Sequence, residues 1–156
     1  MIIKSCNSKD ALLLRNLAKQ CKPLDIHTHY TYWIICKFFG DSCFIISNEN
    51  NPIGYIMTIV KNNILFIWQI GILKEYRGNH YSKILLDSVK QYAINNNYSK
   101  ILVSISPNNK SSYYTFQNYC NHNNLTIIKL NDYVDINDKD ENFVEFEYLY
   151  EIILKD

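Results

Sequence analysis

The sequence predicts one α/β domain, with a mixed central sheet and helices on both of its faces. Two observations carry this prediction. Three consecutive strand-like segments are followed by alternating strand-like and helix-like segments, an order typical of a mixed sheet. The chain has 156 residues, of which 47% are hydrophobic, so residues 1–156 suit a single domain with one hydrophobic core.

Charge and cysteine content narrow the class of protein. The formal net charge of +1 gives no global field of the kind that marks a nucleic-acid binder. No apolar run approaches transmembrane length, and the opening segment is too short to be a secretory leader. The five cysteines are odd in number and form no CxxC pair, which is typical of reduced thiols. We therefore expect a cytoplasmic protein with no nucleic-acid or membrane partner.

The first half of the chain predicts a strand, two helices and a hairpin. The first helix is expected to begin at Ser8, a favoured N-cap residue, and the second, which is rich in aromatic residues, to end at Gly40. A turn-rich segment at 48–52 separates the two strands of the hairpin. The expected ranges are 2–4 for the first strand, 8–18 and 28–39 for the helices, and 42–47 and 53–60 for the hairpin.

The second half begins with an almost wholly apolar strand at 64–73, which is typical of the centre of a sheet. After residue 78 the apolar residues take helical spacing up to Ala93, and three asparagines then end the helix. Residues 131–142 are polar and acidic, and we expect them to form a mobile loop. The remaining expected elements are a strand at 101–105, a helix at 109–119, and strands at 125–130 and 143–154.

The turn between the 64–73 strand and the next helix is the first candidate site. It contains Arg77 and Gly78, and the helix starts at once. Helix N-termini carry unpaired N–H groups and the positive end of the helix dipole, so this turn can bind a pyrophosphate. Arg77 adds a permanent cation with a geometry that suits phosphate. The alternative is an ordinary strand–helix turn with a solvated arginine.

This turn resembles the coenzyme A loop of the GNAT N-acetyltransferase superfamily, Arg/Gln-x-x-Gly-x-Gly/Ala. Arg77 and Gly78 match its common form, whereas His80 and Ser82 replace small residues, so His80 is either a phosphate donor or the mark of a decayed loop. The resemblance implies a GNAT fold, in which a sheet of about seven strands is splayed at its middle, and acetyl-CoA as cosubstrate without a metal. The residues that it implies in cofactor binding are Ile70, Gly71, Ile72, Arg77, Gly78, Asn79, His80, Tyr81, Ser82 and Asn109.

A narrower resemblance, spread over most of the chain, is to the L-2,4-diaminobutyrate acetyltransferase family of ectoine synthesis. Leu-Asp-Ile-His-Thr-His-Tyr-Thr-Tyr at 24–32 is similar to that family's Leu-Asp-x-Asn-Ser-x-Tyr-x-Tyr, with His27 in place of Asn and Thr28 in place of Ser. The resemblance implies direct acetyl transfer to a small diamine substrate, by a homodimer. Further similar stretches follow in the same order, at 39–43, 66–70 (Phe-Ile-Trp-Gln-Ile), 106–112 and 145–150 (Glu-Phe-Glu-Tyr-Leu-Tyr).

Acetylation of an amine requires groups that hold a cation and remove its proton. For a lysine-like amine, deprotonation costs about 4–5 kcal/mol at pH 7. Buried carboxylates can hold the ammonium and accept its proton. The resemblance places Asp25, Glu145 and Glu147 near the substrate as catalytic candidates, and the spacing of the two glutamates puts them on one strand face. The alternative for the glutamates is an exposed pair on an edge strand.

Aromatic residues and histidines complete the set of candidates. Trp68 could lay its ring against an ammonium or be a core residue of a central strand, and Tyr30 could orient the amine or only pack. His27 and His29 have the spacing of a metal pair, but no third ligand is evident, so we expect no metal. The predicted substrate-binding residues are Asp25, Tyr30, Trp68 and Glu147.

Two other functions fit the same residues. One is acetylation of a different amine, such as a polyamine or a peptide N-terminus, with acidic groups supplied by the 131–142 segment. The other is a CoA-binding or regulatory module that has lost catalysis through His80. Binding of acetyl-CoA separates this module from an inert fold, and addition of a diamine separates an enzyme from a sensor.

Overall fold

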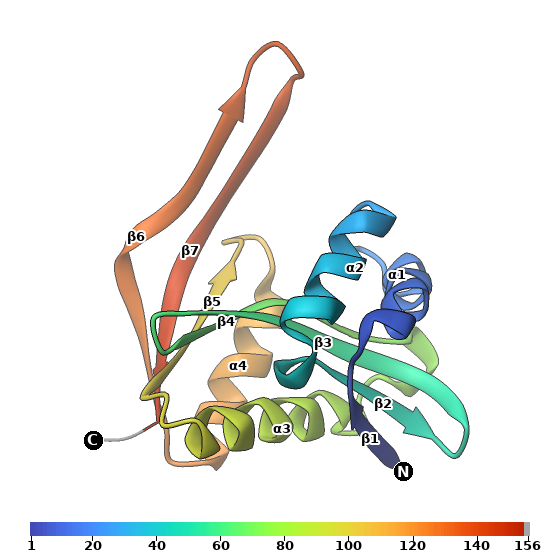
Figure 1. Cartoon of the computed structure of the whole chain (residues 1–156). Coiled ribbons are helices and arrows are strands. Elements are labelled where there is room, and N and C mark those ends of the chain that lie inside the picture. Colours follow the sequence, from blue (N-terminus) through green and yellow to red (C-terminus); the bar gives the residue numbers. More distant parts are fainter. Residues whose placement is uncertain (155–156) are drawn as a thin grey trace.

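The computed structural model describes residues 1–154 and contains a seven-stranded mixed sheet with helices on both faces (Figure 1). The strand order is β1-β2-β3-β4-β5-β7-β6, and β4 and β5 pair in parallel while the other neighbours are antiparallel. The predicted fold class and the predicted order of strands and helices are confirmed.

The strands are β1 (Ile2–Ser5), β2 (Phe44–Asn48), β3 (Asn51–Lys61), β4 (Ile64–Ile72), β5 (Lys100–Ile105), β6 (Thr126–Asp138) and β7 (Phe143–Ile153). The helices are α1 (Ala11–Gln20), α2 (His29–Phe38), α3 (Tyr81–Asn95) and α4 (Lys110–His122). Short 3-10 helices are η1 (Ser8–Asp10), η2 (Gly40–Ser42) and η3 (Lys74–Tyr76).

The sheet separates two hydrophobic cores. Helices α3 and α4 cover one face, and α1 and α2 cover the other (Figure 1). Alternate residues of β3 serve the two cores, because successive side chains of a strand point to opposite faces: Ile56 packs on the α3 side, and Tyr55 and Met57 pack on the α1 side. All five cysteines are buried free thiols. No helix within residues 1–154 is long and apolar enough to cross a membrane.

Several predicted element boundaries were wrong, and two of the differences come from 3-10 turns. The first helix is capped by Asn7 and not by Ser8: the Asn7 side chain accepts a hydrogen bond from the Lys9 N–H, and Asp10 accepts one from the Asn7 N–H. This reciprocal capping starts the helix as the 3-10 turn η1. The segment after Gly40 likewise begins as a 3-10 turn, so β2 starts two residues later than expected.

The prediction of a mobile loop at 131–142 was wrong. Strand β6 continues to Asp138 and β7 begins at Phe143, so most of this segment is paired strand. The hairpin end formed by residues 133–148, which we call the arm, projects away from the body of the molecule (Figure 1). Both faces of the arm are largely exposed and carry polar residues, which hides the usual alternation of a half-buried strand.

The sheet opens between β4 and β5, as the GNAT resemblance implied. The parallel pairing stops at Ile67 and Val103, although β4 runs on to Ile72. Beyond this point β5 stays paired with β7, and β4 stays paired with β3. A bulge accompanies the separation: Met57 lies opposite Gln69 and Thr58 opposite Ile67, so Trp68 is the extra residue.

The turn that leads into α3 contains two left-handed residues. Gly78 has φ 79° and His80, the N-cap of α3, has φ 62°. Glycine reaches such angles without strain, whereas a histidine has a Cβ that crowds the backbone there. His80 therefore carries a conformational cost at a position where the loop pattern normally has glycine.

We expect His80→Gly to raise the free energy of unfolding by about 0.5–1 kcal/mol, since relief of the left-handed strain exceeds the greater entropy of glycine in the unfolded chain. Urea unfolding of the two proteins measures the difference. Ser82→Gly, in the first turn of α3, is the matched control and should lower stability by about 0.5–1 kcal/mol. A less stable His80→Gly protein would show that the imidazole makes a stabilising contact.

Candidate active site

The open end of β4 presents backbone groups to the gap beside it. The Leu73 N–H donates to the Ile53 carbonyl of β3, and in an antiparallel pair the residues that bond to the neighbour alternate. The backbone groups of Gly71 therefore face β3, and those of Ile70 and Ile72 face the gap toward β5. Binding of the cofactor by Ile70 and Ile72, which the resemblance implies, stays a prediction.

Gly71 itself is required by packing. A Cβ there would lie 2.9 Å from Leu24 Cδ1, 3.0 Å from Tyr55 Cε1 and 3.1 Å from Cys21 Cβ. The loop between α1 and α2, residues 21–28, packs so closely on β4 here that a side chain at this position would force its neighbours to shift. Close packing brings the candidate residues of that loop to the splayed strand.

The turn Gly78–Ser82 fits an anionic group such as a pyrophosphate. Tyr81 and Ser82 open the first turn of α3, where backbone N–H groups have no helical partner. A Cβ on Gly78 would meet nothing within 4 Å, so the space above this residue is open. The Asn79 side chain donates to the carbonyls of Tyr76 and Arg77, which stabilises the turn.

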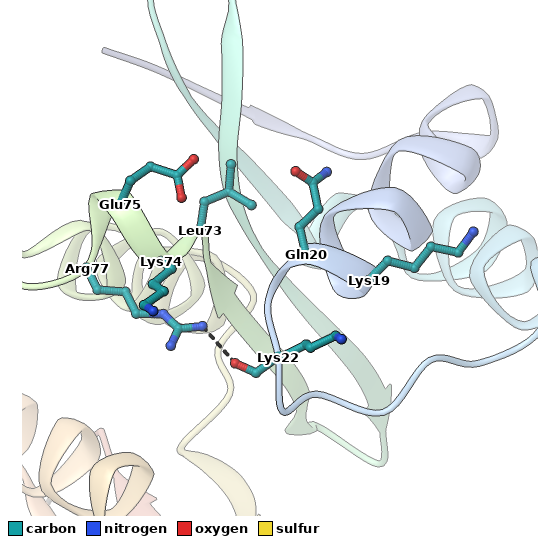
Figure 2. Close-up of a pocket in the computed structure, with 7 residues that line it drawn as sticks. All are labelled: Lys19, Gln20, Lys22, Leu73, Lys74, Glu75 and Arg77. Carbon is teal, nitrogen blue, oxygen red and sulfur yellow. Dashed lines mark hydrogen bonds between the residues drawn. The ribbon is translucent and has the colours of Figure 1, made fainter.

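Arg77 is part of the scaffold of this turn. Its Nε donates to the Ile72 carbonyl at 3.0 Å. Its Nη2 donates to the Lys22 carbonyl, also at 3.0 Å (Figure 2). Arg77 therefore cross-links the end of β4 to the 21–28 loop, and its binding of phosphate stays a prediction. A shallow depression of about 600 Å³ lies beside it, lined by Lys19, Gln20, Lys22, Leu73, Lys74, Glu75 and Arg77 (Figure 2). With three lysines and one arginine against one glutamate, its electrostatic environment is positive.

Asn109 has a local structural role. It is the N-cap of α4, and its Oδ1 accepts a hydrogen bond from the Ser112 N–H at 3.0 Å. This bond starts α4 directly after β5. A contact between Asn109 and the pantetheine arm stays a prediction.

Trp68 is not a core residue. As the extra residue of the bulge it is turned outward, and 38% of its surface is exposed. Its ring centroid lies 5.0 Å from that of His27. Tyr30, by contrast, is 69% exposed on α2 and stacks on Trp33, and His29 is exposed at the start of the same helix. The structure thus joins Trp68 and His27, and shows no such contact for Tyr30.

The two glutamates lie at the base of the arm. Glu145 and Glu147 share one face of β7, opposite Ile136 and Val134 of β6, and β7 is paired with β5 only as far as Tyr148. The two residues are therefore on a strand edge, as the alternative has it, but they are half-buried and not exposed.

These glutamates are electrostatic neighbours of Asp25. Burial raises the pKa of Glu145, and the negative charges of Glu147 and Asp25 raise it further, while a positive charge on His27 would lower it. The structure thereby makes Glu147, Asp25 and His27 electrostatic neighbours of Glu145, and we call Asp25, which is exposed, Glu145 and Glu147 the carboxylate cluster. Carboxylates so placed can attract a small cation, and a carboxylate whose pKa is raised is a better proton acceptor. In residues 1–154 no three His, Cys, Asp or Glu side chains form a group that could hold a metal ion.

Gln69 is the residue that sequence reasoning missed. It is only 7% exposed, and its amide contacts the Asp25 carbonyl, the His27 ring and the hydroxyls of Tyr55 and Tyr32. One signal was present in the sequence: Gln69 is the only polar residue within the otherwise apolar 64–73 segment. A buried polar residue in such a strand must have partners, which marks it as worth explaining.

Known proteins place this architecture in a family. The sequence model of the Acetyltransferase (GNAT) family matches residues 12–121. The L-2,4-diaminobutyric acid acetyltransferase of Halomonas elongata is 27% identical over 121 residues, which cover 75% of this chain and 63% of the relative. That of Streptomyces avermitilis is 28% identical over 119 residues, covering 70% and 64%. The chain thus spans just under two thirds of the length of these curated relatives.

Solved structures agree on the fold. The diaminobutyrate acetyltransferase EctA of Paenibacillus lautus, in complex with L-2,4-diaminobutyric acid and coenzyme A, superposes with a TM-score of 0.86 at 20% identity, covering 99% of this chain and 96% of its own. Ard1 from Thermoplasma volcanium gives 0.80 at 12% identity, covering 99% and 98%. With the splayed β4, the turn before α3 and a family match over more than half of its length, the chain belongs to the GNAT acetyltransferase family.

Proposed function

We propose that the protein transfers the acetyl group of acetyl-CoA to the 4-amino group of L-2,4-diaminobutyrate, as a single domain, in a ternary complex. The observation that carries this proposal is the carboxylate cluster beside the open end of β4. Membership of the GNAT family and the names of the curated relatives support it. The product, N4-acetyl-L-2,4-diaminobutyrate, would then serve ectoine synthesis.

The two substrates would approach from different sides of β4. The backbone of Ile70 and Ile72 and the Gly78–Ser82 turn would hold acetyl-CoA, with Asn109 on the pantetheine arm. Bound there, acetyl-CoA supplies a thioester whose carbonyl carbon is open to attack by an amine. The diamine would lie against Trp68 and the carboxylate cluster, with Tyr30 at the rim.

Proton removal is the task of the carboxylate cluster. Glu145 is the best proton acceptor, because burial and its negative neighbours raise its pKa toward that of a useful base. Asp25 and Glu147 would hold the ammonium groups, and the Trp68 ring adds a cation–π contact. The neutral amine would then form the C–N bond as the C–S bond breaks, and the thiolate of CoA would leave with the electron pair and take up the second proton that the nitrogen loses. Since CoA is a thiol with a pKa near that of cysteine, it is a tolerable leaving group.

Substrate selectivity tests the proposed function. A site with fixed carboxylates spaced for a short diamine rejects longer chains through unpaired polar groups. We expect kcat/KM for L-2,4-diaminobutyrate to exceed that for lysine or spermidine by about 100-fold or more. Equal rates with spermidine would contradict this substrate while leaving an acetyltransferase. Binding of acetyl-CoA without acetylation of any amine would indicate a non-catalytic module.

The pH dependence of the reaction tests Glu145 as the base. Activity requires its ionised form, so kcat/KM rises as pH increases through the pKa of Glu145. Glu147→Gln removes a negative charge that raises this pKa, so the acid limb of the profile should move to lower pH. Glu151→Gln, on the same strand but paired with Lys100 at 3.0 Å, should leave the limb in place. Glu145 would be excluded as the base if the acid limb of Glu147→Gln stayed at the pH of the native protein. It would also be excluded if Glu145→Gln still showed this limb.

We also propose that the protein is a homodimer in which a second copy covers the arm. A two-stranded hairpin is marginally stable alone, yet beyond Tyr148, which pairs with Ile105 of β5, the arm pairs only within itself. It also exposes apolar side chains on both of its faces, Tyr133 and Val144 on one and Ile136 and Phe143 on the other, at 47–68% exposure. Burial of these side chains against a second copy would stabilise the arm.

Val144→Asp should weaken this dimer, since it places a charge in the proposed interface at a side chain that is 68% exposed. Sedimentation equilibrium over a range of concentrations gives the mass. Leu12→Asp, which is 58% exposed on α1, is the matched control and should not change it. A monomeric native protein, or a Val144→Asp dimer of unchanged affinity, would contradict the proposal.

A further inference from the structure

A buried amide connects the 21–28 loop to the splayed strand. Gln69 follows the bulge residue Trp68 on β4 and points to the α1 side of the sheet, where Tyr55 and Tyr32 lie. Its Nε2 is 2.8 Å from the Asp25 carbonyl oxygen and 3.3 Å from the Nε2 of His27. One side chain of the cofactor-facing strand thus contacts both ends of the segment 25–27.

The partners of Gln69 determine the orientation of its amide. The Asp25 carbonyl can only accept a hydrogen bond, so the amide atom beside it is the NH2 group. The Oε1 then faces the Tyr55 hydroxyl at 2.8 Å and that of Tyr32 at 3.4 Å. Burial raises the pKa of the Tyr55 hydroxyl, which keeps it protonated and able to donate. If the amide were rotated, its Oε1 would lie 2.8 Å from the Asp25 carbonyl oxygen, and two acceptors would face each other. The rotated orientation is therefore excluded.

This orientation in turn determines the form of His27. The NH2 group of Gln69 is a donor, so the His27 nitrogen that faces it at 3.3 Å must accept. A nitrogen that accepts carries no proton, which places the single proton of a neutral imidazole on Nδ1. If His27 were protonated on both nitrogens, its Nε2–H donor would face the NH2 donor of Gln69. The residue is also held through its backbone, because Arg15 Nε donates to its carbonyl at 3.2 Å.

We propose that Gln69 is a positioning residue of the amine site, which holds the segment 25–27 on β4 and keeps His27 neutral with its proton on Nδ1. The role in the amine site rests on the proposed function, whereas the state of the imidazole rests on the hydrogen bonds alone. His27 then presents one N–H donor beside the carboxylate cluster.

The neutral state matters because of the groups that surround His27. Asp25 precedes it in the loop, and Glu145 on β7 is its electrostatic neighbour, with Glu147 on the same strand face. The Arg15 guanidinium donates to its backbone carbonyl, and the Tyr32 ring centroid lies 6.0 Å from its own. Three carboxylates by themselves favour an imidazolium. An imidazolium would compete with the substrate ammonium for the cluster and would lower the pKa of Glu145. The NH2 group of Gln69 disfavours this charge. The carboxylate cluster therefore stays available to the diamine, and the pKa of Glu145 is not lowered by His27.

The state of the imidazole can be observed without any substrate. Nitrogen NMR of the protein labelled with 15N-histidine distinguishes the two neutral tautomers and the imidazolium, and His27→Asn identifies the signals. At neutral pH we expect His27 as the neutral form with a protonated Nδ1. An imidazolium, or a neutral form protonated on Nε2, would overturn the proposal whatever the protein acetylates. This measurement requires no variant of Gln69 to fold.

Gln69→Glu tests the cause. A carboxylate cannot donate to His27, so Nε2 should gain a proton in this variant, whereas Gln91→Glu on the exposed side of α3 should change nothing. With L-2,4-diaminobutyrate as substrate, kcat/KM should fall about tenfold or more, while acetyl-CoA affinity is unchanged. An imidazole signal identical to that of the native protein would refute the role of Gln69. A native protein with the expected imidazole but no activity on diaminobutyrate would instead refute only the proposed substrate.

Discussion

The site depends on one backbone constraint, the end of the parallel pairing between β4 and β5 at Ile67 and Val103. A parallel strand inside a sheet normally has both of its edges bonded. Here β4 keeps β3 and loses β5, so the backbone groups of Ile70 and the N–H of Ile72 on the open side are available to another chain-like molecule, while the Ile72 carbonyl accepts from Arg77. The separation also turns Trp68 outward as a bulge, because the strand gains one residue relative to β3.

The same strand organises the opposite side of the site. Gly71 lets the 21–28 loop lie on β4, and Arg77 ties that loop to the end of the strand through the Lys22 and Ile72 carbonyls. Gln69 adds a third connection, to the Asp25 carbonyl. These contacts are made by the strand that opens for the cofactor. Any shift of β4 on cofactor binding would therefore also move the groups that we propose to bind the amine.

Strand β7 completes the site because it stays paired with β5 where β4 separates from it. Where β4 departs, β5 remains paired with β7 as far as Ile105 and Tyr148. Beyond that point β7 continues into the arm and carries Glu145 and Glu147 past the open end of the sheet. In this position the pKa of Glu145 is raised by burial and by carboxylates from two different parts of the chain.

The sequence by itself determined the features that depend on neighbours along the chain. Apolar spacing predicts the alternation of strands and helices, and the almost wholly apolar 64–73 segment identifies the central strand. The turn with Arg77 and Gly78 follows from the same local pattern, and resemblance to known families supplied the carboxylates as candidates. The 131–142 segment was misread because local polarity reports exposure, and a strand of the arm that is exposed on both faces looks like a loop.

Only the tertiary structure decided which residues meet. Asp25, His27, Gln69 and Glu145 are brought together from three separate segments, and no periodicity within a segment encodes such a contact. The bulge at Trp68 depends on the register between β3 and β4, and the interior position of β7 depends on the strand order of the sheet. The state of His27 depends on the orientation of a buried amide, which is set by hydroxyl and carbonyl groups that are distant in sequence. Spacing in a sequence describes local geometry, whereas the chemistry of this site comes from long-range contacts that form only when the sheet is assembled.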